Sequence, residues 1–115
     1  MKYAIIGSRD YKNYEQFKAT LDANYKDITE IISGGARGAD SMAERYAKEH
    51  GIPTQVLVPD WEQYGKAAGH IRNTDIISAA DVVVAYWDGI SKGTKDSLRK
   101  AQAAGKPFFI HLTKS

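Results

Sequence analysis

The chain has 115 residues, 43% of them hydrophobic, which suits one domain with one core, so we expect no second domain. Its 16 lysines and arginines against 14 aspartates and glutamates give a formal net charge of +2, which argues against the dense basic surface that binding to nucleic-acid phosphates requires. The absence of cysteine excludes disulfides and thiolate metal sites, and no apolar run approaches the roughly 20 residues of a membrane span, so we expect a cytoplasmic protein.

Short runs of β-branched and aromatic residues alternate along the chain with longer amphipathic stretches. In chain order they predict a strand at 3–7, a helix at 14–25, a strand at 28–33, a helix at 39–50, a strand at 54–58, a helix at 66–79, a strand at 81–86, a helix at 94–104 and a strand at 106–111. This alternation predicts an α/β fold of Rossmann-like architecture: a three-layer sandwich with a mostly parallel five-stranded sheet, formed by residues 1–115 as one domain.

Two of the predicted helices carry clear apolar patterns. In the helix at 39–50 the apolar side chains recur at the spacing of one buried face, and Gly51 and Pro53 end the helix. The helix at 14–25 presents aromatic and leucine side chains that either pack on the sheet or pair two copies of the chain. We expect a homo-oligomer.

Four loops that join a strand to the following helix carry the residues of greatest chemical interest. They are 7–10, 34–40, 59–65 and 88–94. Because crossovers between parallel strands are right-handed, all four loops are expected at the carboxyl edge of the sheet. Side chains from these loops are therefore predicted to converge on one site.

The strongest motif is Ser33-Gly34-Gly35-Ala36-Arg37-Gly38-Ala39-Asp40, a glycine-rich turn between a strand and a helix. Its glycines let the backbone approach an anion, and the start of the following helix supplies free amides and a positive dipole end. We therefore predict phosphate binding there, the alternative being an ordinary glycine-rich loop. Asp40 either caps the turn or accepts a ligand hydroxyl. The spacing differs from the dinucleotide fingerprint GxGxxG, and the P-loop pattern is absent.

The last helix opens on a second glycine-rich loop at 89–94. Thr94 either caps this helix or, together with Lys92 and Gly93, binds a phosphate. Arg9, just after the first strand, has the planar fork that grips a phosphate with two hydrogen bonds. Two cradles and an arginine are thus predicted to face one edge of the sheet.

Residues 61–73 combine an aromatic residue with a polar row at the start of a helix. Trp61 offers a flat surface on which a base could stack, or else completes a core. Lys66, His70 and Asn73 can share a helix face, which is either a ligand-binding row or a solvated surface. His70 has no second histidine at ligand spacing, so we predict no metal site.

Five short sequence motifs, which follow one another along the chain, resemble those of a known family. They are Gly7-Ser8-Arg9-Asp10, Ser33 to Asp40, Asp60-Trp61 with Tyr64 to Gly69, Ile71-Arg72-Asn73, and Ser91-Lys92-Gly93-Thr94. Over almost the whole chain they resemble the YspA/YpsA-like branch of the SLOG superfamily, Rossmann-like domains for nucleotide ligands in bacterial and phage conflict or stress systems. The resemblance implies binding of a nucleotide or a nucleotide-derived signal, and no reaction common to the family.

The same superfamily contains the LOG-type phosphoribohydrolases, which cleave the N-glycosidic bond of nucleoside 5′-monophosphates. Their helix arginine corresponds to Arg72, but the final acidic position of their PGGxGTxxE segment is Ser97 here. Glycosidic cleavage normally uses a carboxylate, for which a serine hydroxyl is a poor substitute. The adjacent Asp96 points about 100° away on a helix. Asp40 or Asp88 is an alternative carboxylate, and we take Arg72 and Asp40 as the candidate catalytic residues.

Our leading hypothesis is a binding domain, without a cofactor, that senses or sequesters a phosphate-bearing nucleotide or nucleotide-derived signal at the carboxyl edge. The predicted ligand-binding residues are Gly7, Ser8, Arg9, Gly34, Gly35, Ala36, Arg37, Gly38, Asp40, Trp61, Lys66, Arg72, Asn73, Gly93 and Thr94. The alternative is an N-glycosidase that acts on nucleoside 5′-monophosphates or related nucleotides. A second alternative is single-stranded nucleic-acid binding, because DNA-processing DprA proteins carry a related domain, although the near-neutral charge argues against nucleic acid. We expect no membrane partner.

Overall fold

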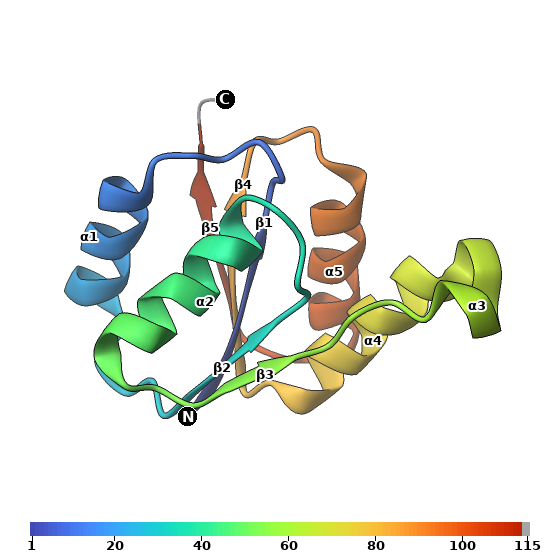
Figure 1. Ribbon diagram of the computed structural model, residues 1–115, viewed down its shortest axis with the longest axis horizontal. Coiled ribbons are helices and arrows are strands. Elements are labelled where there is room, and N and C mark those ends of the chain that lie inside the picture. The colour runs from blue at the N-terminus through green and yellow to red at the C-terminus, as the bar shows by residue number, and fades with distance from the viewer. Residues whose placement is uncertain (114–115) are drawn as a thin grey trace.

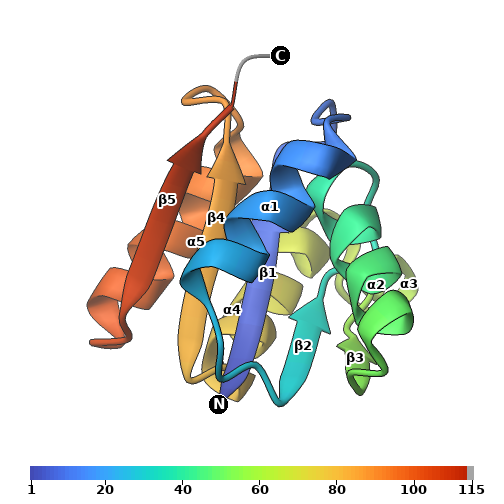
Figure 2. The ribbon, with the colours of Figure 1, turned by 90° about the vertical axis from the view of Figure 1, so that its left-hand side faces the viewer.

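The computed structural model describes residues 1–113 and contains a five-stranded parallel sheet with helices on both faces (Figure 1). The strands are β1 (Lys2–Gly7), β2 (Glu30–Ser33), β3 (Thr54–Val56), β4 (Val82–Trp87) and β5 (Phe108–Leu112). The helices are α1 (Tyr14–Asn24), α2 (Ala39–His50), α3 (Trp61–Tyr64), α4 (Ala68–Ala79) and α5 (Lys92–Ala103), with a 3-10 turn, η1 (Gly65–Ala67), before α4. Neighbouring strands follow the order β3-β2-β1-β4-β5 (Figure 2). This architecture confirms the predicted Rossmann-like α/β fold.

The two faces of the sheet carry separate apolar cores because side chains alternate along a strand. On β1, Tyr3 and Ile5 join the core under α1 and α2, whereas Ala4 and Ile6 join the core under α4 and α5. All four side chains are buried. The uninterrupted apolar runs of β1 and β4 thus belong to central strands that are covered on both faces, as such runs predict.

The outer strands β3 and β5 are more exposed than the central ones. β3 ends at Val56, two residues before the predicted end, because its neighbour β2 ends at Ser33 and offers no further partner. Val58, which precedes Pro59, therefore leaves the sheet and lies exposed. This departure carries the chain away from the sheet toward α3 (Figure 1).

The helix predicted at 66–79 is divided in the structure. α4 begins only at Ala68, and the short helix α3 and the turn η1 precede it. Gly65 has a φ of 55°, a left-handed conformation that interrupts a right-handed helix. Lys66 consequently lies on η1 and not on the helix face that Asn73 occupies.

The helix α5 begins at Lys92, two residues earlier than predicted, so Thr94 lies inside the first turn and does not cap the helix. The Asp88 carboxylate fixes this start, because it accepts hydrogen bonds of 2.8 Å from the amides of both Ile90 and Ser91. Ser91 takes the cap position but makes no capping bond with its side chain.

The helices α1, α2, α4 and α5 each pack one side on the sheet. On α1, Phe17 and Leu21 are fully buried in the core, which is one of the two roles predicted for the apolar side of this helix. α2 ends at Gly51 with a left-handed φ of 65°, as its sequence predicts. Within residues 1–113, no helix has the length and apolar character needed to cross a membrane.

Candidate functional site

A cavity of about 430 Å³ opens at the carboxyl edge of the sheet, where the end of β1 and the turn before α2 face α4 and the first turn of α5. We call it the inner cavity. Nine of the predicted ligand-binding residues line it: Gly7, Arg9, Ala36, Arg37, Asp40, Arg72, Asn73, Gly93 and Thr94. The fold therefore brings the two glycine-rich helix starts to one cavity.

A second cavity of about 410 Å³, the outer cavity, adjoins the inner one. Four residues line both cavities: Arg9, Ala36, Arg37 and Arg72. From the predicted set, the outer cavity adds Gly34, Gly35 and Trp61. Trp61 is 57% exposed, so its ring is available to a ligand and does not complete a core. The two cavities adjoin one another at these shared residues, and we refer to the pair as the groove.

Three predicted ligand-binding residues line neither cavity. Ser8 is buried, and its hydroxyl accepts a hydrogen bond of 3.0 Å from the Asp88 amide. Gly38 packs its backbone against the loop after β1, where an added Cβ would overlap the Ser8 carbonyl. Lys66 is exposed on η1. The first two residues support the site from behind, and the third lies away from it.

The first turn of α5 presents backbone donors to the inner cavity. Within residues 1–113, the amides of Lys92, Gly93 and Thr94 have no hydrogen-bond acceptor, and Ser91 supplies none. All four residues line the inner cavity. The free amides and the positive end of the helix dipole together make this turn suited to an anion.

The glycine-rich turn before α2 is partly occupied by the protein itself. The amide of Ala36 donates to the Asp40 carboxylate at 3.2 Å, and the amide of Gly35 donates to a serine hydroxyl at 3.2 Å. The amides of Arg37 and Gly38 have no acceptor in the described part of the chain. Part of this cradle is therefore filled by a carboxylate, and the start of α5 is the more open anion site.

Asp40 and Arg72 enclose Gly34. An added Cβ on Gly34 would lie 2.8 Å from both a guanidinium nitrogen of Arg72 and a carboxylate oxygen of Asp40, and Arg72 donates to the Gly34 carbonyl at 2.6 Å. Burial raises the pKa of Asp40 to about 6, although the Ala36 amide and the Arg72 guanidinium favour the charged form. A buried carboxyl with such a pKa can exchange a proton near neutral pH.

Replacing Asp40 by asparagine tests this raised pKa. Since the folded pKa of about 6 exceeds the unfolded value of 3.8, protonated Asp40 stabilises the fold at acid pH, and this contribution is lost as the pH rises through about 6. We therefore expect the unfolding free energy of Asp40→Asn, relative to the parent, to rise by about 3 kcal/mol between pH 3 and pH 7. Urea unfolding at several pH values measures it.

Asp88→Asn serves as the contrasting variant. The amides of Ser91 and Ile90 lower the pKa of Asp88, so its contribution to stability is present above the unfolded pKa and is lost as the pH falls. Asp88→Asn should therefore be less stable than the parent at pH 7, with the difference shrinking toward acid pH. Equal pH slopes for the two variants would contradict the raised pKa of Asp40.

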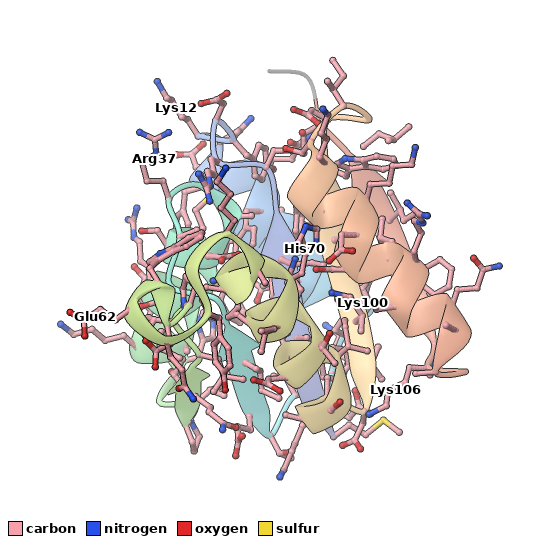
Figure 3. The ribbon with its side chains drawn as sticks, turned by 90° about the vertical axis from the view of Figure 1, so that its right-hand side faces the viewer. Lys12, Arg37, Glu62, His70, Lys100 and Lys106 are labelled. Atoms are coloured by element: carbon pink, nitrogen blue, oxygen red, sulfur yellow. The ribbon has the colours of Figure 1, made fainter. Side chains whose placement is uncertain are left out.

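Asn73 belongs to a polar cluster that joins α4 to α5. Asp96 accepts hydrogen bonds from the Asn73 side-chain amide at 3.1 Å and from Lys100 at 2.8 Å, and lies 3.3 Å from His70 Nδ1. Figure 3 shows His70 and Lys100 between these two helices. Asp96 does not line the inner cavity, whereas Ser97 does, so the cavity wall at that position carries a hydroxyl and no carboxylate.

Asp10 and Ser91 line the inner cavity but were not predicted as ligand-binding residues. A serine before a helix is a common N-cap, and this preference could have identified Ser91. Asp10 ends the Gly7-Ser8-Arg9-Asp10 motif and lies in a loop expected at the carboxyl edge, and that position is the signal that could have identified it. In residues 1–113, no three histidine, cysteine, aspartate or glutamate side chains gather as metal ligands.

Comparison with known proteins gives both sequence and structural relatives. Residues 1–64 match the model of the YspA, cpYpsA-related SLOG family. The Gene 61 protein of Mycobacterium phage D29 is 42% identical over 83 residues, which are 67% of this chain and 66% of that protein. DNA processing protein A (DprA) of Streptococcus pneumoniae superposes with a TM-score of 0.81 at 18% identity, over 98% of this chain and 50% of that one.

DprA of Helicobacter pylori superposes with a TM-score of 0.74 at 27% identity, over 99% of this chain and 66% of that chain. That structure was described for its single-stranded DNA binding mode. The chain thus spans between half and two thirds of the length of these three relatives.

Proposed function

Because this chain belongs to the YspA, cpYpsA-related SLOG family, we propose that it binds a phosphate-bearing nucleotide or nucleotide-derived signal in the groove formed by the inner and outer cavities. The observation that carries the proposal is the set of unbonded amides at the start of α5, which belong to residues that line the inner cavity. These amides accept an anion without any rearrangement of the backbone.

The charges around the inner cavity favour an anionic guest. Four cationic side chains line it, against two carboxylates. The four are Arg9, Arg37, Arg72 and Lys92, and the two are Asp10 and Asp40. Figure 3 shows Arg37 at the carboxyl edge, above α4. Arginines suit phosphate because the guanidinium can donate two parallel hydrogen bonds.

The outer cavity suits the base of the same ligand. Trp61 and Val58 are exposed apolar side chains on its wall, and Pro59 lies between them in the chain. A nucleobase that stacks on the indole of Trp61 would keep its polar edges in contact with solvent. The shared arginines lie between this surface and the start of α5, so one ligand can place its phosphate in the inner cavity and its base in the outer one.

The second candidate is single-stranded nucleic-acid binding. Arginines line both cavities of the groove and the exposed Trp61 lines the outer one, and such a combination can hold a backbone and a stacked base. The similarity to the Helicobacter pylori DprA supports the same reading. The formal net charge of +2 favours a small ligand over a long polyanion.

The N-glycosidase alternative depends on Asp40. Its raised pKa and its place in the wall of the inner cavity are the features that favour proton exchange with a bound nucleotide. Arg72, which encloses Gly34 together with Asp40, would then neutralise the substrate phosphate. The hydroxyl of Ser97 offers no substitute for the missing acid.

Thermal unfolding with a ligand panel tests the proposal. The panel contains ADP-ribose, cyclic nucleotides and nucleoside 5′-monophosphates, each paired with the matching nucleoside that lacks phosphate. We expect stabilisation by phosphate-bearing members only, because a ligand at about 100 times its Kd stabilises the fold by about 2.7 kcal/mol. No shift with any member would contradict the proposal.

Two further measurements distinguish the alternative functions from the proposed one. A shift with single-stranded oligonucleotides alone, weakening steeply with salt, would favour the second candidate. Release of free base, detected by chromatography and lost in Asp40→Asn, would establish the glycosidase. The cytoplasmic location and the homo-oligomeric state expected from the sequence stay predictions.

A further inference from the structure

A third cavity, of about 350 Å³, lies on the opposite side of the sheet from α4 and α5, between α1 and the edge strand β5. The residues that line it are Tyr11, Gln16, Thr20, Tyr86, Ile110, His111, Leu112 and Thr113. In the described part of the chain, no helix lies in front of β5 on this side (Figure 2). Unlike the inner cavity, it has no lysine, arginine, aspartate or glutamate among its lining residues.

Near-parallel rings form one wall of this cavity. Tyr86 stacks with Tyr11 at a centroid distance of 5.6 Å and an interplanar angle of 13°, and with His111 at 5.0 Å and 17°. Tyr11 and Tyr86 are buried, so their orientation is fixed by packing. A wall of parallel rings favours a flat ligand over a bulky one.

Most polar groups of the wall already have partners. The Tyr86 hydroxyl and the Thr20 hydroxyl lie 2.5 Å apart, and the Tyr11 hydroxyl donates to Gln16 Oε1 at 2.8 Å. These hydrogen bonds make the wall rigid and leave few free donors or acceptors on these side chains for a ligand. The unsatisfied groups of the cavity belong to β5 and to Thr113, the residue that follows it.

Thr113 is the clearest of these unsatisfied groups. It is 8% exposed, and its hydroxyl has no hydrogen-bond partner among residues 1–113. Its amide donates to the Trp87 carbonyl at 2.8 Å, so the chain still follows the sheet at this residue. By strand alternation Thr113 faces the same side as His111, the side of α1 and the cavity. A buried unpaired hydroxyl is uncommon and favours a missing partner.

His111 supplies a second unsatisfied group. Its Nε2 lies 2.7 Å from the Tyr25 hydroxyl, and we assign that hydroxyl as the donor, which places the proton of the neutral ring on Nδ1. Burial lowers the pKa of His111, so the ring is neutral at pH 7. Nδ1 has no acceptor in the described chain. The wall thus offers one donor beside a hydroxyl that can donate or accept.

We infer that this cavity is a second binding site, for a small, neutral, planar aromatic molecule that carries a carbonyl or amide group, with Thr113 and the His111 ring as its hydrogen-bonding partners. The parallel rings select flatness, and the uncharged wall excludes ionised ligands, because a charge moved out of water without a partner is strongly unfavourable. This site is independent of the nucleotide groove, so either can exist without the other.

Benzamide is the probe that fits this description, and two relatives serve as controls. Benzoate has the same ring with a charged group, and cyclohexanecarboxamide has the same amide on a non-planar ring. In an NMR titration of the full chain, followed in proton–nitrogen correlation spectra, we expect benzamide to cause saturable shifts of the amide signals of His111, Thr113 and Tyr86. Neither control should cause such shifts. Shifts confined to the groove around Arg37 and Gly93, or no saturable shift, would overturn the proposal.

Thr113→Val separates binding from folding. Since the hydroxyl is unsatisfied, its loss should leave the melting temperature unchanged or higher. Benzamide binding should weaken about fivefold, which corresponds to the net free energy of one hydrogen bond. Thr74→Val removes an exposed hydroxyl on α4 and should leave the benzamide affinity as it is. Unchanged affinity in Thr113→Val would show that the hydroxyl does not bind the ligand, and a loss of stability in that variant would show that it serves the fold. Either result would overturn the role assigned to Thr113.

Discussion

Replacement of Gly38 by alanine is expected to lower the free energy of unfolding by about 3 kcal/mol, a large part of the stability of a domain of this size. Gly38 has φ 73° and ψ −125°, a conformation that residues with a Cβ rarely adopt. An added Cβ would also overlap the Ser8 carbonyl and lie 2.6 Å from that of Arg9. Strain and overlap therefore act together at the point where the turn before α2 crosses the loop after β1.

Gly51→Ala is the matched control for this variant. Gly51 also has a positive φ, of 65°, but an added Cβ would meet nothing within 4 Å. Only the left-handed strain remains there, so we expect a loss of about 1 kcal/mol. Chemical denaturation of both variants measures the difference. Equal losses would mean that the close crossing at Gly38 does not contribute to stability.

Replacement of Gly93 by aspartate is expected to weaken nucleotide binding by at least about tenfold without weakening the fold. Gly93 is the second residue of α5, and an added Cβ there would meet nothing within 4 Å. A carboxylate in the first turn interacts favourably with the helix dipole, and leaving glycine improves helix propensity, so the unfolding free energy should stay equal or rise by up to about 1 kcal/mol. The same carboxylate would repel a phosphate at the free amides.

Gly93→Asn provides the control, because it has the same shape without the charge. Titration calorimetry with pyrophosphate and with the most stabilising nucleotide of the panel should show a loss of at least about tenfold for Gly93→Asp, and a much smaller loss for Gly93→Asn. Binding that is unaffected by the aspartate would place the phosphate away from α5. The Gly34–Gly38 turn, with Arg37 and its free amide, would then be the remaining candidate.

The order of strands and helices and the parallel arrangement of the sheet follow from local sequence patterns alone. Hydrophobic periodicity is a local property, and the alternation of strand and helix leaves few arrangements once crossovers must be right-handed. The same rule placed the loops after β1, β2 and β4 at one edge, as the inner cavity shows. The motifs from Gly7 to Thr94 also predicted the SLOG relationship that the match over residues 1–64 confirms.

The use of each site residue depends instead on the three-dimensional fold, because hydrogen bonds between distant segments depend on packing that no local pattern records. Asp40 turns back onto the Ala36 amide and fills part of the glycine-rich cradle. Ser8 is held by the Asp88 amide behind the cavity. The anion site therefore shifts toward the start of α5, whose amides are free because Asp88 binds only the two amides before it.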